Sequence, residues 1–171
     1  MEIHHPRDEK DVEAIVRAAI LGAQPLAIVG HGSKSGVGAL MEPHASLDLS
    51  ALSGIHGYEP HELILTLHAG TPLGEVMQLL AANHQELPFE PMDVSVLMGG
   101  NGMGTIGGAV ACGWSGPRRI KAGAARDHVL GISAVSGRGE AFKAGGRVVK
   151  NVTGYDLAKL MAGSWGTLAV M

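Results

Sequence analysis

The stretch Ile28-Val29-Gly30-His31-Gly32-Ser33-Lys34-Ser35-Gly36 runs from the apolar tetrad 26–29 into a loop of glycine and serine. Four consecutive apolar residues before such a loop predict a buried strand. A Gly/Ser loop after a strand can turn several backbone N–H groups to one side and hold a phosphate oxygen. It is not a Walker A loop, because Ser33 precedes Lys34 and the required spacing is missing. The stretch predicts an anion-binding loop, and a plain surface turn is the alternative.

A second glycine cluster, residues 99–116, holds eight of the chain's 26 glycines. Clustered glycine inside an apolar chain indicates backbone that approaches another group closely. Residues 102–107 match G-x-G-x-x-G, and Asp127 lies twenty residues beyond Gly107, which superficially meets a Rossmann fingerprint. We disfavour that interpretation, because further glycines and a proline follow before a sustained helix can form.

The composition describes a folded chain of one-domain size. Of 171 residues, 46% are hydrophobic and 17% are charged, which excludes intrinsic disorder. A net charge of −3 and 4% aromatic residues do not favour nucleic-acid binding. No apolar run approaches the length of about 20 residues that a membrane span needs. Residues 8–13 carry four acids, unlike a signal peptide, so we expect a cytoplasmic protein.

Side chains with catalytic or ligating chemistry form no recognisable constellation. The single Cys112 can form neither an internal disulfide nor a zinc site by itself. The nine histidines lack the spacing of a zinc motif, so we expect no metal. The serines Ser33, Ser35 and Ser115 lack a G-x-S-x-G elbow. The sequence therefore identifies no general base.

Hydrophobic periodicity and turn residues predict regular elements on both sides of a long irregular stretch, residues 88–126. A helix over 71–83 would have Thr71 as its N-cap and Pro72 at its first position. The remaining predicted elements are a helix over 8–21, strands over 26–29, 47–49 and 62–68, a hairpin of 129–135 with 140–143, a helix over 156–161 and a strand over 167–171. We expect the chain to be cut short at Met171, because this last strand stops without a turn or cap.

Charge is segregated along the chain. Residues 117–150 hold eight basic and two acidic residues, for +6, so the remainder carries −9. Either this is a solvated basic face, or it is a surface that binds anions or docks another subunit.

Several motifs, taken together and in order, resemble a known family. The stretch 25–36, Gly104-Thr105-Ile106-Gly107-Gly108 and Arg126-Asp127-His128-Val129-Leu130-Gly131 resemble the flavin domain of the vanillyl-alcohol oxidase / p-cresol methylhydroxylase (PCMH-type) family. The stretch 149–157 with Gly163-Ser164-Trp165-Gly166-Thr167-Leu168 is similar to the FAD-binding (E) subunits of bacterial glycolate oxidases. The resemblance covers essentially the whole chain.

The resemblance implies an α+β fold of two subdomains, residues 1–53 and 54–171, without the family's C-terminal cap domain. It also implies bound FAD, with its pyrophosphate on the first loop, its isoalloxazine and ribityl groups along the second cluster and its adenine near the last strand. The implied cofactor-binding residues are Gly30, His31, Gly32, Ser33, Lys34, Ser35, Gly36, Gly104, Thr105, Ile106, Gly107, Gly108, Ser115, Gly116 and Val170. Relatives with covalent flavin carry His where this chain has Gly32, so we expect non-covalent FAD.

The implied activity is the oxidation of a small 2-hydroxy acid, glycolate to glyoxylate, by hydride transfer to flavin. The alternative is a flavin-binding subunit that relays electrons or stabilises a complex without catalysing the reaction. The implied partners are a second flavin subunit, an iron–sulfur subunit and the hydroxy acid, with attachment to the inner membrane only through those subunits. Rossmann-type NAD(P) binding remains a distant third hypothesis.

Overall fold

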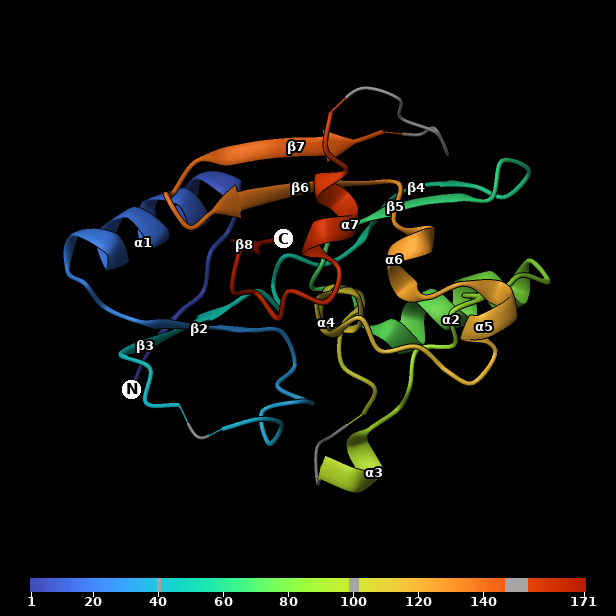
Figure 1. The fold of residues 1–171 in the computed structure, drawn as a ribbon, viewed down its shortest axis with the longest axis horizontal. Coiled ribbons are helices and arrows are strands. Elements are labelled where there is room, and N and C mark those ends of the chain that lie inside the picture. The colour runs from blue at the N-terminus through green and yellow to red at the C-terminus, as the bar shows by residue number, and fades with distance from the viewer. Residues whose placement is uncertain (40, 99–101, 147–153) are drawn as a thin grey trace.

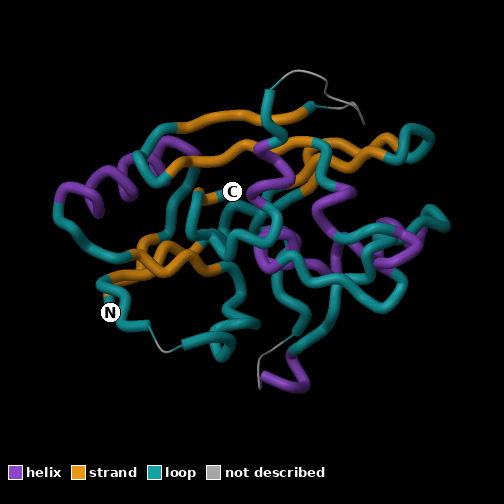
Figure 2. Tube along the Cα trace, in the orientation of Figure 1, coloured by secondary structure: helices purple, strands orange, loops and turns teal. Residues whose placement is uncertain are grey.

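The computed structural model describes residues 1–39, 41–98, 102–146 and 154–171, and it mixes short helices with three small sheets (Figures 1 and 2). This confirms the predicted α+β class. The elements are β1 (Glu2–His4), α1 (Glu9–Leu21), β2 (Leu26–Val29), β3 (Ala45–Asp48), β4 (Ile55–Glu59), β5 (Ile64–Leu67), α2 (Leu73–Ala82), α3 (Ser95–Met98), α4 (Ile106–Cys112), α5 (Arg119–Ala122), α6 (Ala125–His128), β6 (Gly131–Ser136), β7 (Ala141–Gly145), α7 (Leu157–Met161) and β8 (Ala169–Val170).

The first sheet is parallel and has the strand order β1-β3-β2. Ala45 of the central strand is in register with Glu2 on one side and Leu26 on the other. The other two sheets are antiparallel: β4 pairs with β5, and β6 pairs with β7 and β8. The first sheet leads from β2 directly into the loop 30–38, so it positions the first glycine cluster.

One hydrophobic core joins the parallel sheet to the β7-β6-β8 sheet. Val12 and Val16 of α1 pack with Leu47, Val135 and Val170, all at most 8% exposed. α1 lies against β6 (Figure 1). Each sheet falls wholly before or after residue 53, whereas this core crosses that position. The division into subdomains 1–53 and 54–171 stays a prediction.

The strongly periodic elements were predictable. α1 begins after Asp8, whose Oδ1 accepts a hydrogen bond from the Asp11 N–H at 2.8 Å, and it ends at Gly22. The strands over 26–29, 47–49 and 62–68, the hairpin β6–β7 and the helix over 156–161 are also present within a few residues of their predicted bounds. The strand over 167–171 is reduced to two residues.

The predicted start of α2 was wrong by one residue. Pro72 is the N-cap and Leu73 begins the helix. Fully buried Thr71 instead accepts a hydrogen bond from the Gly54 N–H at 3.0 Å and donates to the His68 carbonyl at 2.7 Å. Its hydroxyl therefore joins β5 to the segment before β4, a tertiary role that the local capping pattern does not reveal.

In its described part, the irregular stretch 88–126 contains the short helices α3, α4 and α5 and the beginning of α6. The most consequential is α4, which forms despite Gly107 and Gly108 because Thr105 caps it: its Oγ1 accepts the Gly108 N–H at 3.1 Å. The expectation that no sustained helix forms before Gly113 was therefore too strict. Among the described residues before α4, an antiparallel bridge between Pro72 and Thr105 leads into the helix in place of a parallel strand, so these described residues form no Rossmann unit.

Two helical glycines should respond in opposite directions to substitution by alanine. A Cβ at Gly107 would lie 2.6 Å from Ala69 Cβ and 2.7 Å from its carbonyl oxygen, whereas a Cβ at Gly74 meets nothing within 4 Å. We expect Gly107→Ala to lower the free energy of unfolding by about 1–3 kcal/mol through overpacking. Gly74→Ala should raise it by about 0.5–1 kcal/mol. Urea unfolding measures both, and equal effects would contradict the packing of α4 on Ala69.

Candidate functional site

The structure brings the two glycine clusters together. The loop that follows β2 packs against the residues that open α4, and the contacts at Gly30 and Gly104 leave no room for side chains at those two positions. A Cβ at Gly30 would lie 2.7 Å from Thr105 Oγ1, and a Cβ at Gly104 would overlap Ser33 Oγ. Gly104 also has φ = +82°, which favours glycine. Segments about seventy residues apart in the sequence therefore form one surface.

The loop itself is a pair of successive turns. The Ser35 N–H donates to the Gly32 carbonyl at 3.1 Å, and the Val37 N–H donates to the Lys34 carbonyl at 3.1 Å. Gly32 has φ = +65°, which lets the chain reverse direction. The side-chain positions of Gly32 and Gly36 are open, with only Val29 Cγ1 at 4.0 Å and Met98 Sδ at 3.9 Å. These two glycines leave space for a bound group.

Ser33 and Lys34 provide the polar groups at the junction. Ser33 is buried, and its Oγ accepts a hydrogen bond from Lys34 Nζ at 3.2 Å. The same Nζ lies 3.4 Å from the position of a Cβ on Gly104 and 3.9 Å from that of a Cβ on Gly108. His31 and Ser35 are exposed beside them. The junction thus combines open glycines, a hydroxyl and one cation.

The backbone N–H groups of the first residues of α4 are used within the protein. Ile106 donates to the Thr71 carbonyl at 3.0 Å, Gly107 donates to Ala69 at 2.8 Å, and Gly108 donates to Thr105. These bonds fix α4 on the turn before α2. The loop 30–38, rather than the start of α4, therefore offers the freer backbone donors.

Ser115 and Gly116 contact a different part of the molecule. Ser115 Oγ accepts the Ala125 N–H at 2.9 Å, and the Gly116 N–H donates to the Phe89 carbonyl at 2.9 Å. A Cβ at Gly116 would lie 2.7 Å from Glu90 Oε2. Packing alone explains the glycine at 116, and a cofactor role for both residues stays a prediction.

Val170 lines a small apolar cavity of about 150 Å³. Its walls come from β2 (Leu26 and Ile28), the turn after β6 (Ser136 and Gly137) and residues 166–170. The cavity lies along the strand that leads into the loop 30–38. Its apolar walls suit a flat aromatic group, and the family resemblance implies adenine near this last strand.

The turn 163–167 packs against α4. The sequence predicted no role for this turn. The Trp165 N–H donates to the Ala111 carbonyl at 2.9 Å, and its ring packs edge-on against Trp114 with centroids 5.6 Å apart. Trp165 has φ = +56°, an uncommon conformation for a bulky residue. Ser164 Oγ is buried and has no hydrogen-bond partner among the described residues. No sequence signal other than the motif 163–168 pointed to these groups.

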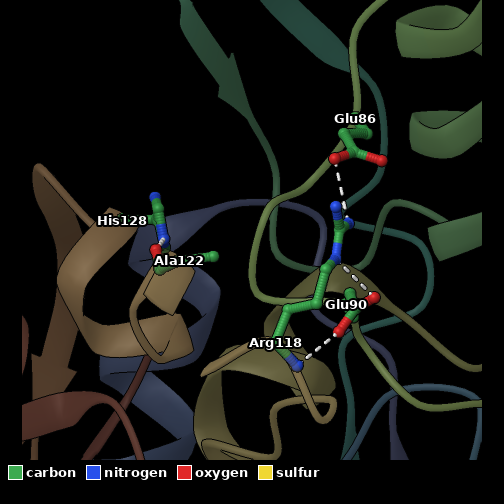
Figure 3. A network of polar contacts seen from close by, with 5 residues as sticks. All are labelled: Glu86, Glu90, Arg118, Ala122 and His128. Atoms are coloured by element: carbon green, nitrogen blue, oxygen red, sulfur yellow. Dashed lines mark hydrogen bonds and ion pairs between the residues drawn. The ribbon is translucent and has the colours of Figure 1, made fainter. Parts of the chain in front are cut away.

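Sequence reasoning also missed the ion-pair network in Figure 3. Arg118 Nε donates to Glu90 Oε1 at 2.7 Å, its Nη2 donates to Glu86 Oε1 at 2.9 Å, and its backbone N–H donates to Glu90 Oε2 at 2.9 Å. The backbone hydrogen bond, followed by the guanidinium, holds the pKa of Glu90 below its usual value. The network fixes the start of α5. His128 Nε2 holds the end of α5 through the Ala122 carbonyl at 2.8 Å.

Within residues 1–39, 41–98, 102–146 and 154–171, no group of three or more His, Cys, Asp or Glu side chains is arranged to hold a metal ion. No helix in the same ranges is long and apolar enough to cross a membrane. Burial raises the pKa of the Cys112 thiol, so it is not an activated nucleophile.

The Glu90–Arg118 network should make stability depend on acid pH. A carboxyl whose pKa is lowered by folding stabilises the protein above its unfolded pKa, and that contribution is lost as pH falls through the lowered folded value. We expect Glu90→Gln to lower the melting temperature near neutral pH, with the difference from wild type shrinking below about pH 4. Glu140→Gln, at an exposed carboxyl of the β6–β7 turn, is the control. A difference that persists unchanged in acid would contradict this assignment.

Comparison with known proteins places this geometry in a family. A family model described as an FAD binding domain matches residues 3–145. Glycolate oxidase subunit GlcE of Escherichia coli is 42% identical over 156 residues, which is 91% of this chain and 43% of that protein. D-2-hydroxyglutarate dehydrogenase of Xanthomonas citri is 35% identical over 169 residues, 97% of this chain and 34% of that protein. The chain therefore spans less than half the length of these curated relatives.

Solved structures agree on the fold. An alkyldihydroxyacetonephosphate synthase superposes with a TM-score of 0.73 at 20% identity, covering 98% of this chain and 29% of that one. The glucose dehydrogenase Phl p 4.0202 superposes with a TM-score of 0.72 at 17% identity, covering 98% and 33%. With the family match over most of the sequence and the two glycine clusters joined at Ser33 and Lys34, the chain belongs to the family of FAD-binding domains.

Proposed function

We propose that this chain is the FAD-binding part of an oxidoreductase that oxidises a small 2-hydroxy acid, with glycolate to glyoxylate as the first candidate reaction. The observation that carries the proposal is the junction of the two glycine clusters, beside which the loop has open positions at Gly32 and Gly36 and the Lys34 ammonium group. The substrate class rests on the relatives, because a glycolate oxidase subunit and a D-2-hydroxyglutarate dehydrogenase both act on 2-hydroxy acids by name.

The residues present fit a dinucleotide. The open positions at Gly32 and Gly36 leave a cradle that side chains would fill, and Lys34 suits a phosphate. The apolar cavity beside Val170 suits an adenine ring. FAD has a negatively charged diphosphate at its centre and an aromatic adenine at one end. The loop with Lys34 matches the diphosphate, and the apolar cavity matches the adenine.

In this proposal the loop 30–36 binds the pyrophosphate and the cavity beside Val170 takes the adenine. The segment 104–108 and, further along, Ser115 and Gly116 line the flavin end. Bound flavin supplies a hydride acceptor for the α-carbon of the hydroxy acid. The chain's own part is to bind and orient the cofactor, because α4 and the loop are fixed to one another by the contacts of Gly30 and Gly104.

We propose that the flavin is bound without a covalent link. Gly32 stands where a linking histidine would be, and His31 is an exposed neighbour one residue earlier. Acid precipitation of the loaded protein should release all yellow colour into the supernatant. Colour that stays in the pellet would contradict non-covalent binding.

We also propose that the protein works in an assembly on the cytoplasmic side of the inner membrane. The relatives named glycolate oxidase subunits GlcE and GlcD support companion subunits. In this proposal they include a second flavin subunit and an iron–sulfur subunit that accepts the electrons.

Substitution at Gly36 should separate cofactor binding from folding. Gly36 is exposed, and a Cβ there would meet only Met98 Sδ at 3.9 Å, so Gly36→Val should fold normally. The same side chain would obstruct a pyrophosphate on the loop. We expect FAD affinity to fall more than tenfold, equivalent to ~1.4 kcal/mol, in a titration of flavin fluorescence. Gly74→Ala is the control, and unchanged affinity in folded Gly36→Val would refute the cradle.

The activity is tested by mixing the FAD-loaded protein anaerobically with glycolate, D-lactate or D-2-hydroxyglutarate. Loss of visible flavin absorbance with one of them is the expected result. FAD binding without reduction by any of them would contradict the proposed catalysis and favour the electron-relay alternative. Absence of FAD binding would overturn the proposal as a whole.

A further inference from the structure

Two histidines on adjacent strands lie in ring contact, and the proposed cofactor site uses neither of them. His56 of β4 and His68, which follows the last residue of β5, have ring centroids 4.1 Å apart and ring planes at 73°. The register of the hairpin shifts between Ile55 and Gly57, so His56 lies at a bulge, where a side chain is re-aimed. His56 is exposed and His68 is half-buried. The contact therefore joins an imidazole in solvent to one that is partly removed from it.

The backbone beside His68 holds the beginning of α4. The His68 carbonyl accepts hydrogen bonds from the Thr71 hydroxyl at 2.7 Å and from the Thr71 N–H at 3.1 Å. The carbonyl of Ala69 accepts the Gly107 N–H at 2.8 Å. The carbonyl of Thr71 accepts the Ile106 N–H at 3.0 Å. One turn thus connects the histidine pair to the glycine-rich helix.

The surroundings of the pair favour neutral rings. Burial, followed by the charge of His56, lowers the pKa of His68 below its usual value. A carboxylate that compensated a proton on His68 would raise this pKa instead. The other ionisable groups on the hairpin and on the helices joined to the turn are Glu59, His61, Glu62, Glu75 of α2 and Cys112 of α4. Protonating both rings would also place two positive charges side by side, so the contact opposes protonation.

We propose that the His56–His68 contact makes the flavin end of the site sensitive to pH in the range where imidazoles titrate. The inference rests on the proposed function, since that function gives α4 a cofactor to line. At neutral pH the unprotonated rings stay in contact and the turn holds α4. In acid, His68 takes up its proton in conformations in which the contact is open and the ring reaches water. The carbonyls that hold α4 then lose their fixed position, and FAD binds more weakly.

Acid should weaken the contact, and neutral pH should restore it. Because folding lowers the pKa of His68, the unfolded and locally opened states bind more protons than the closed state. The contact therefore stabilises the closed state above the ordinary histidine pKa of about 6.5. That contribution is lost as pH falls through the lowered value. The apparent affinity for FAD falls with the fraction of closed molecules.

The test is a titration of flavin fluorescence on either side of the histidine range, at about pH 7.5 and about pH 5. Wild type should bind FAD several-fold more weakly at the lower pH. His68→Phe keeps a flat ring in the contact but cannot be protonated, so it should lose most of this difference. His56→Gln, at an exposed position, removes the neighbouring charge and should reduce the difference as well.

The matched control is His61→Gln, because His61 is an exposed histidine in the turn of the same hairpin. It should keep the pH dependence of wild type. An equal change of FAD affinity with pH in wild type, His68→Phe and His56→Gln would overturn the inference while leaving FAD binding intact.

Amide hydrogen exchange without cofactor tests the contact independently of FAD. Acid should lower the protection factors of the Ile106 and Gly107 amides more in wild type than in His68→Phe or His56→Gln. Equal changes in all three proteins would overturn the inference whether or not FAD binds. If FAD binds at neither pH and the exchange difference is present, the proposed function is overturned and the proton-sensitive hold on α4 is supported.

Discussion

The close contact between the loop 30–38 and the residues that open α4 determines the arrangement of the candidate site. The contact requires glycine on both sides, because Gly30 lies too close to Thr105, and Gly104 too close to Ser33, for either position to carry a Cβ. Thr105 is central to this contact, since it is buried, caps α4 and fills the space beside Gly30. The same residue thus stabilises a glycine-rich helix and fixes that helix against the loop.

The rest of the fold holds this contact in place. β2 delivers the loop, and the turn before α2 holds α4 through the carbonyls of Ala69 and Thr71. On the opposite side, α1 secures the β6–β7 hairpin: Arg17 Nε donates to the Gly139 carbonyl at 2.8 Å, and Glu13 Oε1 accepts the Ala141 N–H at 2.8 Å. The core beneath α1 thereby connects the parallel sheet to the strand that carries Val170.

The glycines of the two clusters divide into two physical classes. At Gly30, Gly104, Gly107 and Gly116 the protein itself occupies the space of the side chain, so these glycines serve packing. At Gly32 and Gly36 the space is open: the positive φ of Gly32 accounts for glycine there, whereas no neighbouring protein atom accounts for glycine at Gly36. A glycine cluster therefore combines positions that protein atoms approach closely with positions whose side-chain space is open.

The sequence by itself determined the elements whose signals are local. Apolar spacing and the Asp8 cap specify α1, consecutive apolar residues specify β2, and Ser136-Gly137-Arg138-Gly139 specifies the turn of the β6–β7 hairpin. Such signals depend on neighbours a few residues away. The motif order also indicated the FAD-binding family, because several spaced motifs are far more specific than either glycine cluster alone.

Only the tertiary structure decided which groups share the site. The strand β1 lacks a pattern of its own and forms through parallel pairing with β3. Arg118 meets Glu90 across 28 residues, and Lys34 reaches Gly104 across a longer separation. Such contacts depend on how separate segments pack. The spacing of residues along the sequence therefore gives no signal for them. The sequence therefore supplied the loop and its charge, and packing placed that charge against the second glycine cluster.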